Sequence, residues 1–589
     1  GRFYQRADGR WVMEDVRAAV SEGRLKYHRF QYQLTDIRAR LQQRPLAETG
    51  GAVVIDVPEA VGMAGDRPWS ARGVWKDPGP AVESHFKMDI ADFPLDGRFR
   101  DALEPPARRV VDSLNLSGTG TAELWFDRPP GRGQKTHLRL KADVSNASLT
   151  FSQFPFEINE LSGHVEFDSQ QHQHWKFSRL QGRHGSSEIT GAGQFIGLPK
   201  PGVLNLTIRA ERLAMDSDLY NAMADSQQSL WQLLDPTGYC DVTTYVHWTA
   251  APGQRAVVRF PAESPVRIYD AVIRPRPFPY EMDVAEALVS FNPNDPRHSG
   301  VQYCDIHSFR ASHKGAPIEA TGWATSHVDG QWRVHLNHLT ATRLPPDDEL
   351  RAALPDSWRE ILTRLKHRGH VSVSDSELDF RGVREDSARV TAAWNMNLYL
   401  HRCALDAGLD LENVTGAVTA RGTWDGVHLD NDGEIQLQST RVLNMPLREI
   451  RGPYSMDDAR LVLGAREVLE SGERARVDRT ERVQAKIYGG TALFDAVVDS
   501  RPGEGYVLFA ELENAQLEAF ARQNMSNAEK LQGNVSAWLA LHGEGESPRD
   551  LRGRGQMEIS PAALYELPVM LEMLNALTTF NPGNRTAFD

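Results

Sequence analysis

The chain has 589 residues, of which 40% are hydrophobic and 25% are charged, a composition typical of folded proteins rather than disordered ones. The 66 Lys and Arg residues and the 79 Asp and Glu residues give a formal net charge of −13, and the basic residues are scattered, which argues against a nucleic-acid partner. No run of about 18 apolar residues occurs, so the sequence predicts no membrane-spanning helix.

The first residues give only weak structural signals. Residues 1–20 contain several charges and lack the apolar core of a signal peptide. The segment from Trp11 to Val20 is predicted to be a short N-terminal helix that covers the sheet rather than binds a membrane. The sequence begins and ends in mid-pattern, so we expect a fragment from which an anchor or export signal is missing.

A helix-like pattern recurs along the chain. Apolar residues and a final Gly follow one another at offsets 0, 4, 11, 15 and 19, and an Asp stands three residues upstream as a predicted N-cap. Prolines within the pattern predict that each helix is broken into two short pieces, and the Gly is predicted to end it. The three copies are Phe99, Leu103, Val110, Leu114 and Gly118 after Asp96; Leu219, Met223, Leu230, Leu234 and Gly238 after Asp216; and Leu350, Leu354, Ile361, Leu365 and Gly369 after Asp347.

Other landmarks also recur along the chain. A shortened fourth copy of the helix pattern covers Leu517 to Gly533. Between the helix patterns, a second set recurs at identical offsets: Ala147, Phe154, Pro155, Phe156, Val165 and Phe167 match Ala271, Phe278, Pro279, Tyr280, Val289 and Phe291. About five runs with strand character lie within each period, separated by turns rich in Gly, Pro and Asp. The unit of the repeat is therefore several strands and one helical segment.

Such a unit cannot cover its own apolar strand faces, so the repeats are expected to join edge to edge. The predicted fold is mainly β: an elongated, repeat-built, curved β-sheet groove, also called a β-taco or repeating β-groove, with short amphipathic helices between repeats. The predicted repeats are residues 1–126, a partial first repeat with the N-terminal helix; residues 127–248; residues 249–380; and residues 381–589, the fourth repeat and the C-terminal region.

The C-terminal region resembles that of AsmA-like proteins. The resemblance rests on residues 531–545, residues 551–559 and the helical pattern Leu564, Leu567, Pro568, Leu571 and Leu574, and residues 147–195 resemble the repeating strands of the same superfamily. The resemblance covers most of residues 90–580. The chain departs from the family in lacking an N-terminal membrane helix.

The resemblance to AsmA/TamB-type repeating β-groove lipid-transfer proteins implies a function. It implies a lipid-binding or lipid-conducting protein of the bacterial cell envelope that moves phospholipid or another lipid between the inner and outer membranes. It also implies a periplasmic location, with an inner-membrane anchor in the full-length protein, a role in outer-membrane biogenesis, and no catalytic residues to carry over.

Alternating strands supply the candidate groove residues. In each of three strands, apolar side chains alternate with polar or small ones and should share one face. These residues are Leu204, Leu206 and Ile208; Trp332, Val334 and Leu336; and Val535, Leu539 and Leu541. The alternative is an envelope scaffold or assembly factor whose trough or sheet edge accepts strands of outer-membrane proteins.

Catalytic and metal signatures are missing from the sequence. None of the common phosphate, dinucleotide, metalloprotease or hydrolase motifs occurs, so we expect no enzyme and no cofactor. A β-rich carbohydrate hydrolase would need two carboxylates converging in a cleft, and the sequence singles out no such pair. Cys240, Cys304 and Cys403 are too widely spaced for a zinc or redox motif and are expected to be buried thiols rather than a disulfide. His172 and His174 would share one strand face and form a metal site only with a third ligand.

Overall fold

The computed structural model is mainly β: strands hold 70% of the residues, and the helices are few and short. The chain divides into two compact units. Unit 1 comprises Gly1–Gln228, Thr237–Ile268 and Ser290–Pro293, and unit 2 comprises Ser229–Pro236, Tyr269–Val289 and Asn294–Asp589. The structure describes residues 1–563 except 6–8, 10, 28–29, 153, 224, 252, 255, 277, 292–300, 328, 355, 365, 384–385, 407–409, 443–444, 466–467, 469–476, 500, 502–504, 525–531 and 545–551.

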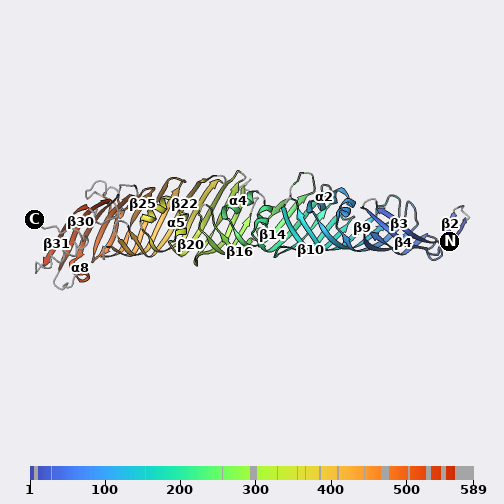
Figure 1. Ribbon diagram of the computed structural model, residues 1–589, viewed down its shortest axis with the longest axis horizontal. Helices are drawn as coiled ribbons and strands as arrows, with labels where there is room; N and C mark the ends of the chain where they lie inside the picture. Colours follow the sequence, from blue (N-terminus) through green and yellow to red (C-terminus); the bar gives the residue numbers. More distant parts are fainter. Residues whose placement is uncertain are drawn as a thin grey trace. The chain divides into compact units, whose positions relative to one another are not determined.

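Unit 1 is one antiparallel sheet whose strands lie side by side in chain order (Figure 1). A separate pair of strands, β1 and β2, precedes it. The strands are β1 (Arg2–Gln5), β2 (Trp11–Glu14), β3 (Arg17–Tyr27), β4 (Phe30–Gln43), β5 (Val54–Ala64), β6 (Arg67–Lys76), β7 (Glu83–Pro94), β8 (Ser117–Arg128), β9 (His137–Phe151), β10 (Phe154–Asp168), β11 (His174–His184), β12 (Ser187–Ile196), β13 (Val203–Ala214), β14 (Thr237–Thr249) and β15 (Val257–Arg259). The helices are α1 (Gly97–Ala102), α2 (Pro105–Leu114) and α3 (Ser217–Ala222).

Unit 2 is also an antiparallel sheet built in chain order. Its one irregularity in the described part lies at β26 and β27, which both pair with β25 on one side and β28 on the other. Its strands are β18 (Val301–His313), β19 (Ala316–His327), β20 (Gln331–Leu344), β21 (Arg368–Val383), β22 (Asp386–Asp406), β23 (Asp410–Trp424), β24 (Leu429–Val442), β25 (Met445–Asp457), β26 (Arg460–Leu463), β27 (Val483–Ile487), β28 (Gly490–Asp499), β29 (Gly505–Gln516), β30 (Gln532–Glu544) and β31 (Arg552–Ala563). Its helices are α5 (Asp348–Ala353), α6 (Asp356–Arg364), the 3-10 turn η2 (Arg479–Glu481) and α8 (Leu517–Asn524).

Three elements straddle the boundary between the units in the sequence. These are α4 (Asp225–Leu234), β16 (Val266–Ile273) and β17 (Met282–Phe291). The first two predicted repeats, residues 1–248, fall almost wholly in unit 1, and most of the last two falls in unit 2.

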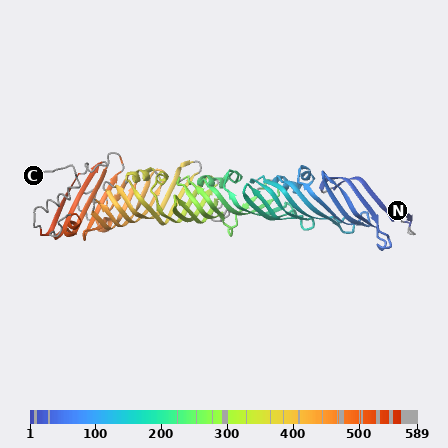
Figure 2. The ribbon, with the colours of Figure 1, turned by 60° about the horizontal axis from the view of Figure 1, so that its bottom comes forward.

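The helical segments are broken in two, as the sequence predicts. In unit 1, α1 and α2 stand between β7 and β8, and α3 follows six strands later, after β13. The predicted N-caps are confirmed: the side chains of Asp96, Asp216 and Asp347 accept hydrogen bonds from the backbone N–H groups of the first helical turns. In unit 1, α2 lies near the ends of the strands (Figure 2).

The predicted role of the repeated Gly as a helix stop is wrong. The α2 helix ends at Asn115, whose φ of 44° is left-handed, and residues Asp235 (47°) and Lys366 (43°) stand at the matching places. Gly118 instead lies inside β8 with a φ of 136°, and a Cβ there would come within 2.5 Å of the Cα of Ala147. The Gly is therefore needed for close strand packing and not for ending the helix.

The predicted N-terminal helix is also wrong. Trp11–Glu14 is strand β2, paired with β1, and Arg17–Tyr27 is strand β3, paired with β4 from Arg17↔Gln42 to Tyr27↔Phe30. Cross-strand hydrogen bonds satisfy the backbone here and override the weak helical pattern of the isolated segment. The predicted C-terminal helical pattern, from Leu564 to Leu574, lies outside the described residues.

The helices pack on the apolar face of each sheet. In unit 1, Ala102 of α1 joins a cluster with Tyr32 and Trp69, and Leu114 of α2 packs against the cluster that contains Leu204. In unit 2, Ala353 of α5 is buried with other apolar side chains of the sheet. The apolar face is thus the inner face of each sheet, and the helices cover only part of it.

Candidate functional site

Two rows of apolar side chains cross unit 1 from β6 to β14. Each row consists of residues that lie directly opposite one another on neighbouring strands, and so share one face of the sheet. The first row is Ala71, Met88, Leu124, Leu140, Phe167, Trp175, Phe195, Leu204 and Trp248. The second row is Trp69, Ile90, Ala122, Ala142, Val165, Phe177, Gly193, Leu206 and Val246.

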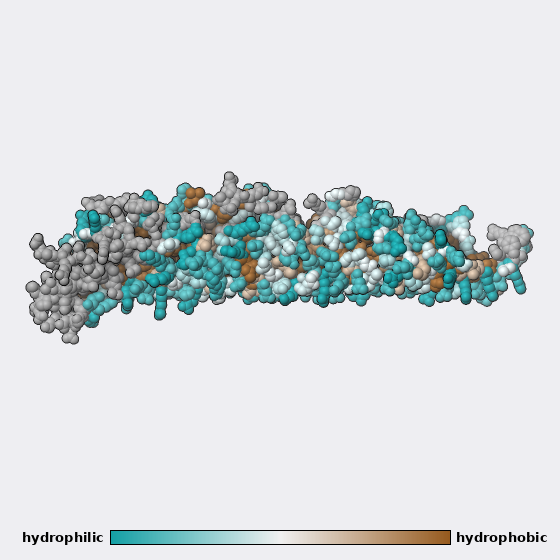
Figure 3. Space-filling view, in the orientation of Figure 1, coloured by the Kyte–Doolittle hydropathy of each residue, from teal (hydrophilic) through white to brown (hydrophobic). Residues whose placement is uncertain are grey.

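The row between these two is polar in every strand. It consists of Ser70, Asp89, Glu123, Lys141, Glu166, Lys176, Gln194, Asn205 and His247. Its side chains alternate with the apolar rows and therefore face the other way. Hydrophilic residues cover most of the face of unit 1 that is seen in Figure 3, and hydrophobic ones show there as small patches. The sheet thus has one polar and one apolar face.

The middle of the apolar rows remains open to solvent. From β8 to β11, all eight members of the two rows are only half-buried, whereas Trp69 and Ile90 at one end and Phe195, Leu204 and Trp248 at the other are buried. With strands about 4.8 Å apart, the nine strands carry the rows over roughly 38 Å. The half-buried stretch itself, from β8 to β11, covers three strand spacings, or roughly 14 Å. Apolar side chains left partly exposed on four adjoining strands form a candidate binding face.

Unit 2 carries rows of the same kind. One row runs from β18 to β25 through Ala311, Ile318, Ala341, Val373, Leu398, Val418, Ile435 and Gly452. A second runs from β19 to β24 through Ala324, Val334, Phe380, Ala392, Trp424 and Leu429. The apolar face is therefore a property of each unit taken separately.

The predicted groove residues lie on these faces. In β13, Leu204 is buried (3% exposed), and Leu206 and Ile208 are half-buried. Trp332, Val334 and Leu336 are all half-buried on one face of β20. In β30, Val535 is buried, Leu541 is half-buried and Leu539 is 40% exposed. Their role in binding lipid stays a prediction.

The sequence reading missed most members of the rows. Phe167, Trp175 and Phe177 lie at the half-buried centre of unit 1, yet only the pairing of β10 with β11 brings them beside Leu140 and Phe195. The alternation Leu138, Leu140, Ala142 predicts the strand at residues 136–143 correctly, but it gives no sign of which residues these side chains lie beside on β8 and β10.

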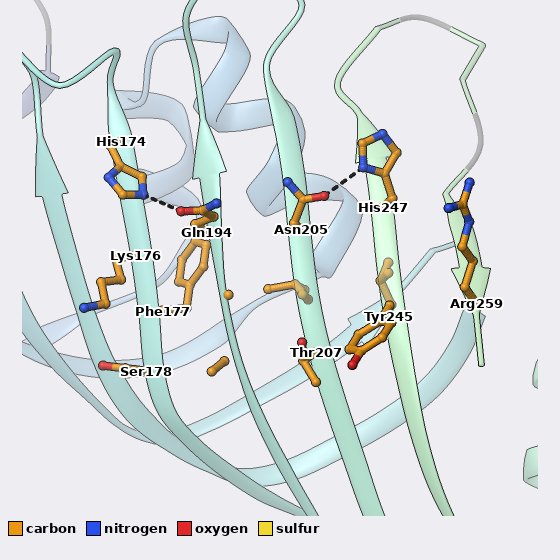
Figure 4. A pocket seen from close by; sticks show the side chains of 14 residues that line it. His174, Lys176, Phe177, Ser178, Gln194, Asn205, Thr207, Tyr245, His247 and Arg259 are labelled. Atoms are coloured by element: carbon orange, nitrogen blue, oxygen red, sulfur yellow. Dashed lines mark hydrogen bonds between the residues drawn. The ribbon is translucent and has the colours of Figure 1, made fainter. Parts of the chain in front are cut away.

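A depression lies over β11 to β15, with a cavity volume of about 880 Å³. Most of its lining side chains belong to the polar face. The Nε2 atom of His174 lies 2.9 Å from Oε1 of Gln194, and Nδ1 of His247 lies 2.8 Å from Oδ1 of Asn205 (Figure 4). These polar groups satisfy one another across neighbouring strands. The lining also includes Phe177, Gly193, Leu206 and Val246 of the second apolar row.

The arrangement of His172 and His174 differs from the one considered from the sequence. His174 is the first residue of β11, whereas His172 precedes the strand with a left-handed φ of 58°. The two imidazoles therefore do not share a strand face, and His174 is occupied by its hydrogen bond to Gln194. This pair does not form the metal site that was considered.

The three cysteines are buried and free, which confirms the expectation of buried thiols. Burial raises the thiol pKa of both Cys240 and Cys304 to about 12. Burial also raises the pKa of Cys403, which lies against Gly369. A thiol with so high a pKa is a poor nucleophile and a poor metal ligand near neutral pH.

Comparison of the sequence with protein-family models and with curated proteins found no match. Within the described residues, no helix is both long and apolar enough to cross a bilayer. The case for a function therefore rests on the geometry of the two sheets.

Proposed function

We propose that this chain is a lipid-binding or lipid-conducting β-groove protein of the bacterial cell envelope, of the AsmA-like type, which moves phospholipid between the inner and outer membranes. The observation that carries the proposal is the pair of apolar rows in unit 1, half-buried from β8 to β11 and backed by a fully polar row on the other face. The proposed location is the periplasm, with anchoring to the inner membrane in the full-length protein.

The energetics of acyl chains favour such a surface. Burial of a methylene from water is worth about 0.8 kcal/mol, so a 16-carbon chain would lose on the order of 12 kcal/mol on leaving a membrane for water. Apolar side chains on every successive strand give the chain an apolar contact at each step of about 4.8 Å. Movement along the rows then needs no fully hydrated intermediate, and the direction of net transfer must be set by another source of free energy.

The chemistry of the rows favours lipid over protein strands. An added strand binds through the backbone N–H and C=O groups of a sheet edge. The rows instead offer side chains on the face of the sheet, such as Leu140, Phe167 and Trp175, while β10 is paired with β9 on one side and with β11 on the other. Such a face fits hydrocarbon, which has no hydrogen bonds to satisfy.

Charge substitution at Leu206 tests the proposal. Leu206→Asp places a carboxylate in the second apolar row, between Gly193 and Val246, and an ion held against hydrocarbon costs at least about 2 kcal/mol. We expect lipid transfer between donor and acceptor vesicles to slow by at least about tenfold. Because Leu206 is only half-buried, the variant should keep its folded circular dichroism spectrum.

Thr207→Asp is the matched control. Thr207 is the next residue of the same strand, is exposed, and lies on the polar face opposite Ala192 and Tyr245. The same charge there should leave transfer unchanged. Equal transfer by folded Leu206→Asp and Thr207→Asp proteins would show that the apolar rows are not the lipid path.

A further inference from the structure

A histidine at the end of β11 is fixed by two contacts. The ring of His184 stacks on Phe156, with centroids 3.9 Å apart and planes 28° apart. Its Nδ1 atom lies 2.7 Å from the backbone oxygen of Glu157. A carbonyl oxygen only accepts hydrogen bonds, so Nδ1 carries the proton. In the neutral ring, Nε2 then presents a lone pair.

That lone pair faces two carboxylates. Nε2 of His184 lies 3.7 Å from Oδ2 of Asp218. One ring nitrogen of His184, one oxygen of Asp216 and one oxygen of Asp218 all lie within 4.8 Å of one another. Oδ1 of Asp216 also accepts from the N–H groups of Asp218 and Leu219 at the start of α3. In the described part of unit 1, no Lys or Arg pairs with either carboxylate. Within the described residues, these three groups thus converge without a lysine or arginine among them.

Unit 2 contains the same cluster with a cation in it. The ring of His313 stacks on Tyr280 with centroids 3.9 Å apart and planes 27° apart, and its Nδ1 lies 2.7 Å from the backbone oxygen of Glu281. Its Nε2 lies 2.9 Å from Asp347 and 3.8 Å from Glu349.

The cation in that cluster is the ammonium group of Lys314. Its Nζ lies 2.7 Å from Oδ2 of Asp347 and 3.1 Å from Oε1 of Glu349, and so bridges the two carboxylates. The two acids stand two residues apart at the start of α5, as Asp216 and Asp218 do at the start of α3.

The residue of unit 1 that corresponds to Lys314 is a glycine, Gly185. The strand pairs His184↔Ser187 and His313↔Ala316 close turns of two residues, so Gly185 and Lys314 occupy the same first turn position. Their φ angles are 56° and 48°. In the described part of unit 1, the cluster keeps the imidazole and both acids but has no lysine at this turn position.

We propose that His184, Asp216 and Asp218 bind a divalent transition-metal cation, of the Zn²⁺ or Mn²⁺ type, in the place that the Lys314 ammonium holds in unit 2. One imidazole nitrogen and two carboxylate oxygens are ligands that such ions accept. Tetrahedral Zn²⁺ needs its ligand atoms about 3.4 Å apart, so the exposed Asp side chains need only rotate inward. The carbonyl of Glu157 on Nδ1 fixes the tautomer that coordination requires. The ion would tie the β11–β12 turn to α3.

Calorimetric titration of the full chain with Zn²⁺ tests this site. We expect a binding event in the natural sequence that becomes at least tenfold weaker in Asp218→Asn. Gly185→Lys should abolish it, because the new ammonium group would fill the site as Lys314 does in unit 2. A Cβ at Gly185 would meet no atom within 4 Å, and Lys314 shows that lysine adopts this turn conformation, so the variant should fold.

Glu349→Gln is the matched control, because it changes the equivalent acid in the cluster that Lys314 already fills, and it should leave Zn²⁺ binding unchanged. A Zn²⁺ event that persists in both Asp218→Asn and Gly185→Lys would place the ion elsewhere and overturn the proposal. Absence of Zn²⁺ binding in the natural sequence would also overturn it, and NMR of the His184 ring at neutral pH would show whether a proton supplies the charge instead.

Discussion

At the scale of single residues, Asp379 shows how the polar face of unit 2 is stabilised. Its carboxylate lies 2.7 Å from the guanidinium of Arg333, 2.7 Å from that of Arg381 and 3.1 Å from Nδ1 of His335. Burial alone would raise the pKa of Asp379, but the hydrogen bonds from the two arginines outweigh it and hold the pKa below its ordinary value. The carboxylate therefore stabilises the fold in its charged form.

Asp379→Asn should lower the free energy of unfolding by about 1 to 3 kcal/mol at neutral pH. Because the folded pKa is depressed, this contribution is fully present above the unfolded pKa of about 3.9 and is lost as the pH falls through the lower folded value. The difference in melting temperature between the two proteins should thus be constant from about pH 5 to 7 and shrink below about pH 4. Asp375→Asn, at a side chain that is 78% exposed, should show almost no difference at any pH.

The buried cysteines lead to a second prediction at this scale. With thiol pKa values of about 12, Cys240 and Cys304 carry almost no thiolate near neutral pH. We expect a disulfide reagent to react slowly with all three cysteines of the folded chain and rapidly after denaturation. Replacement of all three by Ala should leave lipid transfer intact. Loss of transfer in a folded triple variant would reveal a role for a thiol that the burial of these residues gives no reason to expect.

At the scale of elements, the repeated Gly of the helix–Gly–strand pattern has a packing role. Gly369 has a φ of 107°, and a Cβ at this position would lie 2.8 Å from the Cα of Cys403 on the neighbouring strand. Both the backbone conformation and the close approach exclude a side chain.

Gly369→Ala should therefore destabilise unit 2 by about 1 to 3 kcal/mol, measured as a lower melting temperature. Gly97→Ala is the control, because Gly97 lies in helix α1 with no atom within 4 Å of its missing Cβ. That substitution should be neutral or stabilising by up to about 1 kcal/mol. A folded Gly369→Ala protein with the same melting temperature as the natural chain would argue against the packing role.

The sequence predicted the type and order of the elements better than their pairing. The broken helix pieces and their Asp caps depend on local patterns, and these predictions agree with the structure, whereas the helix predicted at Trp11 to Val20 does not. The cross-strand rows depend on register, which shifts at bulges such as the one between Phe177 and Leu180, where Arg179 has a left-handed φ of 52°. A pattern of alternation does not show where such an extra residue is inserted.

The first repeat also carried a signal that the sequence reading missed. Phe30 and Tyr32 stack with ring centroids 6.0 Å apart, and they take the same place at the start of a strand as Phe154 and Phe156 in the next repeat, whose centroids lie 5.7 Å apart. The same spacing of aromatics would have located β4, and it would have argued against a helix just before it.

At the scale of the whole molecule, the proposed function predicts that the purified chain carries lipid. Native mass spectrometry should detect adducts with the mass of phospholipids, and extraction should recover them. Folded Val334→Asp protein, with a charge in the apolar row of unit 2 opposite Ala324 and Phe380, should carry less. Lipid-free protein from a membrane-rich host would contradict the lipid-binding proposal.

The run of strands between the helical segments of unit 1 has a consequence for how much lipid its apolar face would hold. Six strands separate α1 and α2 from α3, which is roughly 29 Å of sheet at the usual strand spacing. An acyl chain in one leaflet spans about half of a hydrocarbon core of roughly 30 Å. This run of strands therefore has room for about two acyl chains end to end. Native mass spectra recorded at rising lipid concentration should then show a small, whole number of lipids for each chain, with a fixed maximum set by the length of the rows.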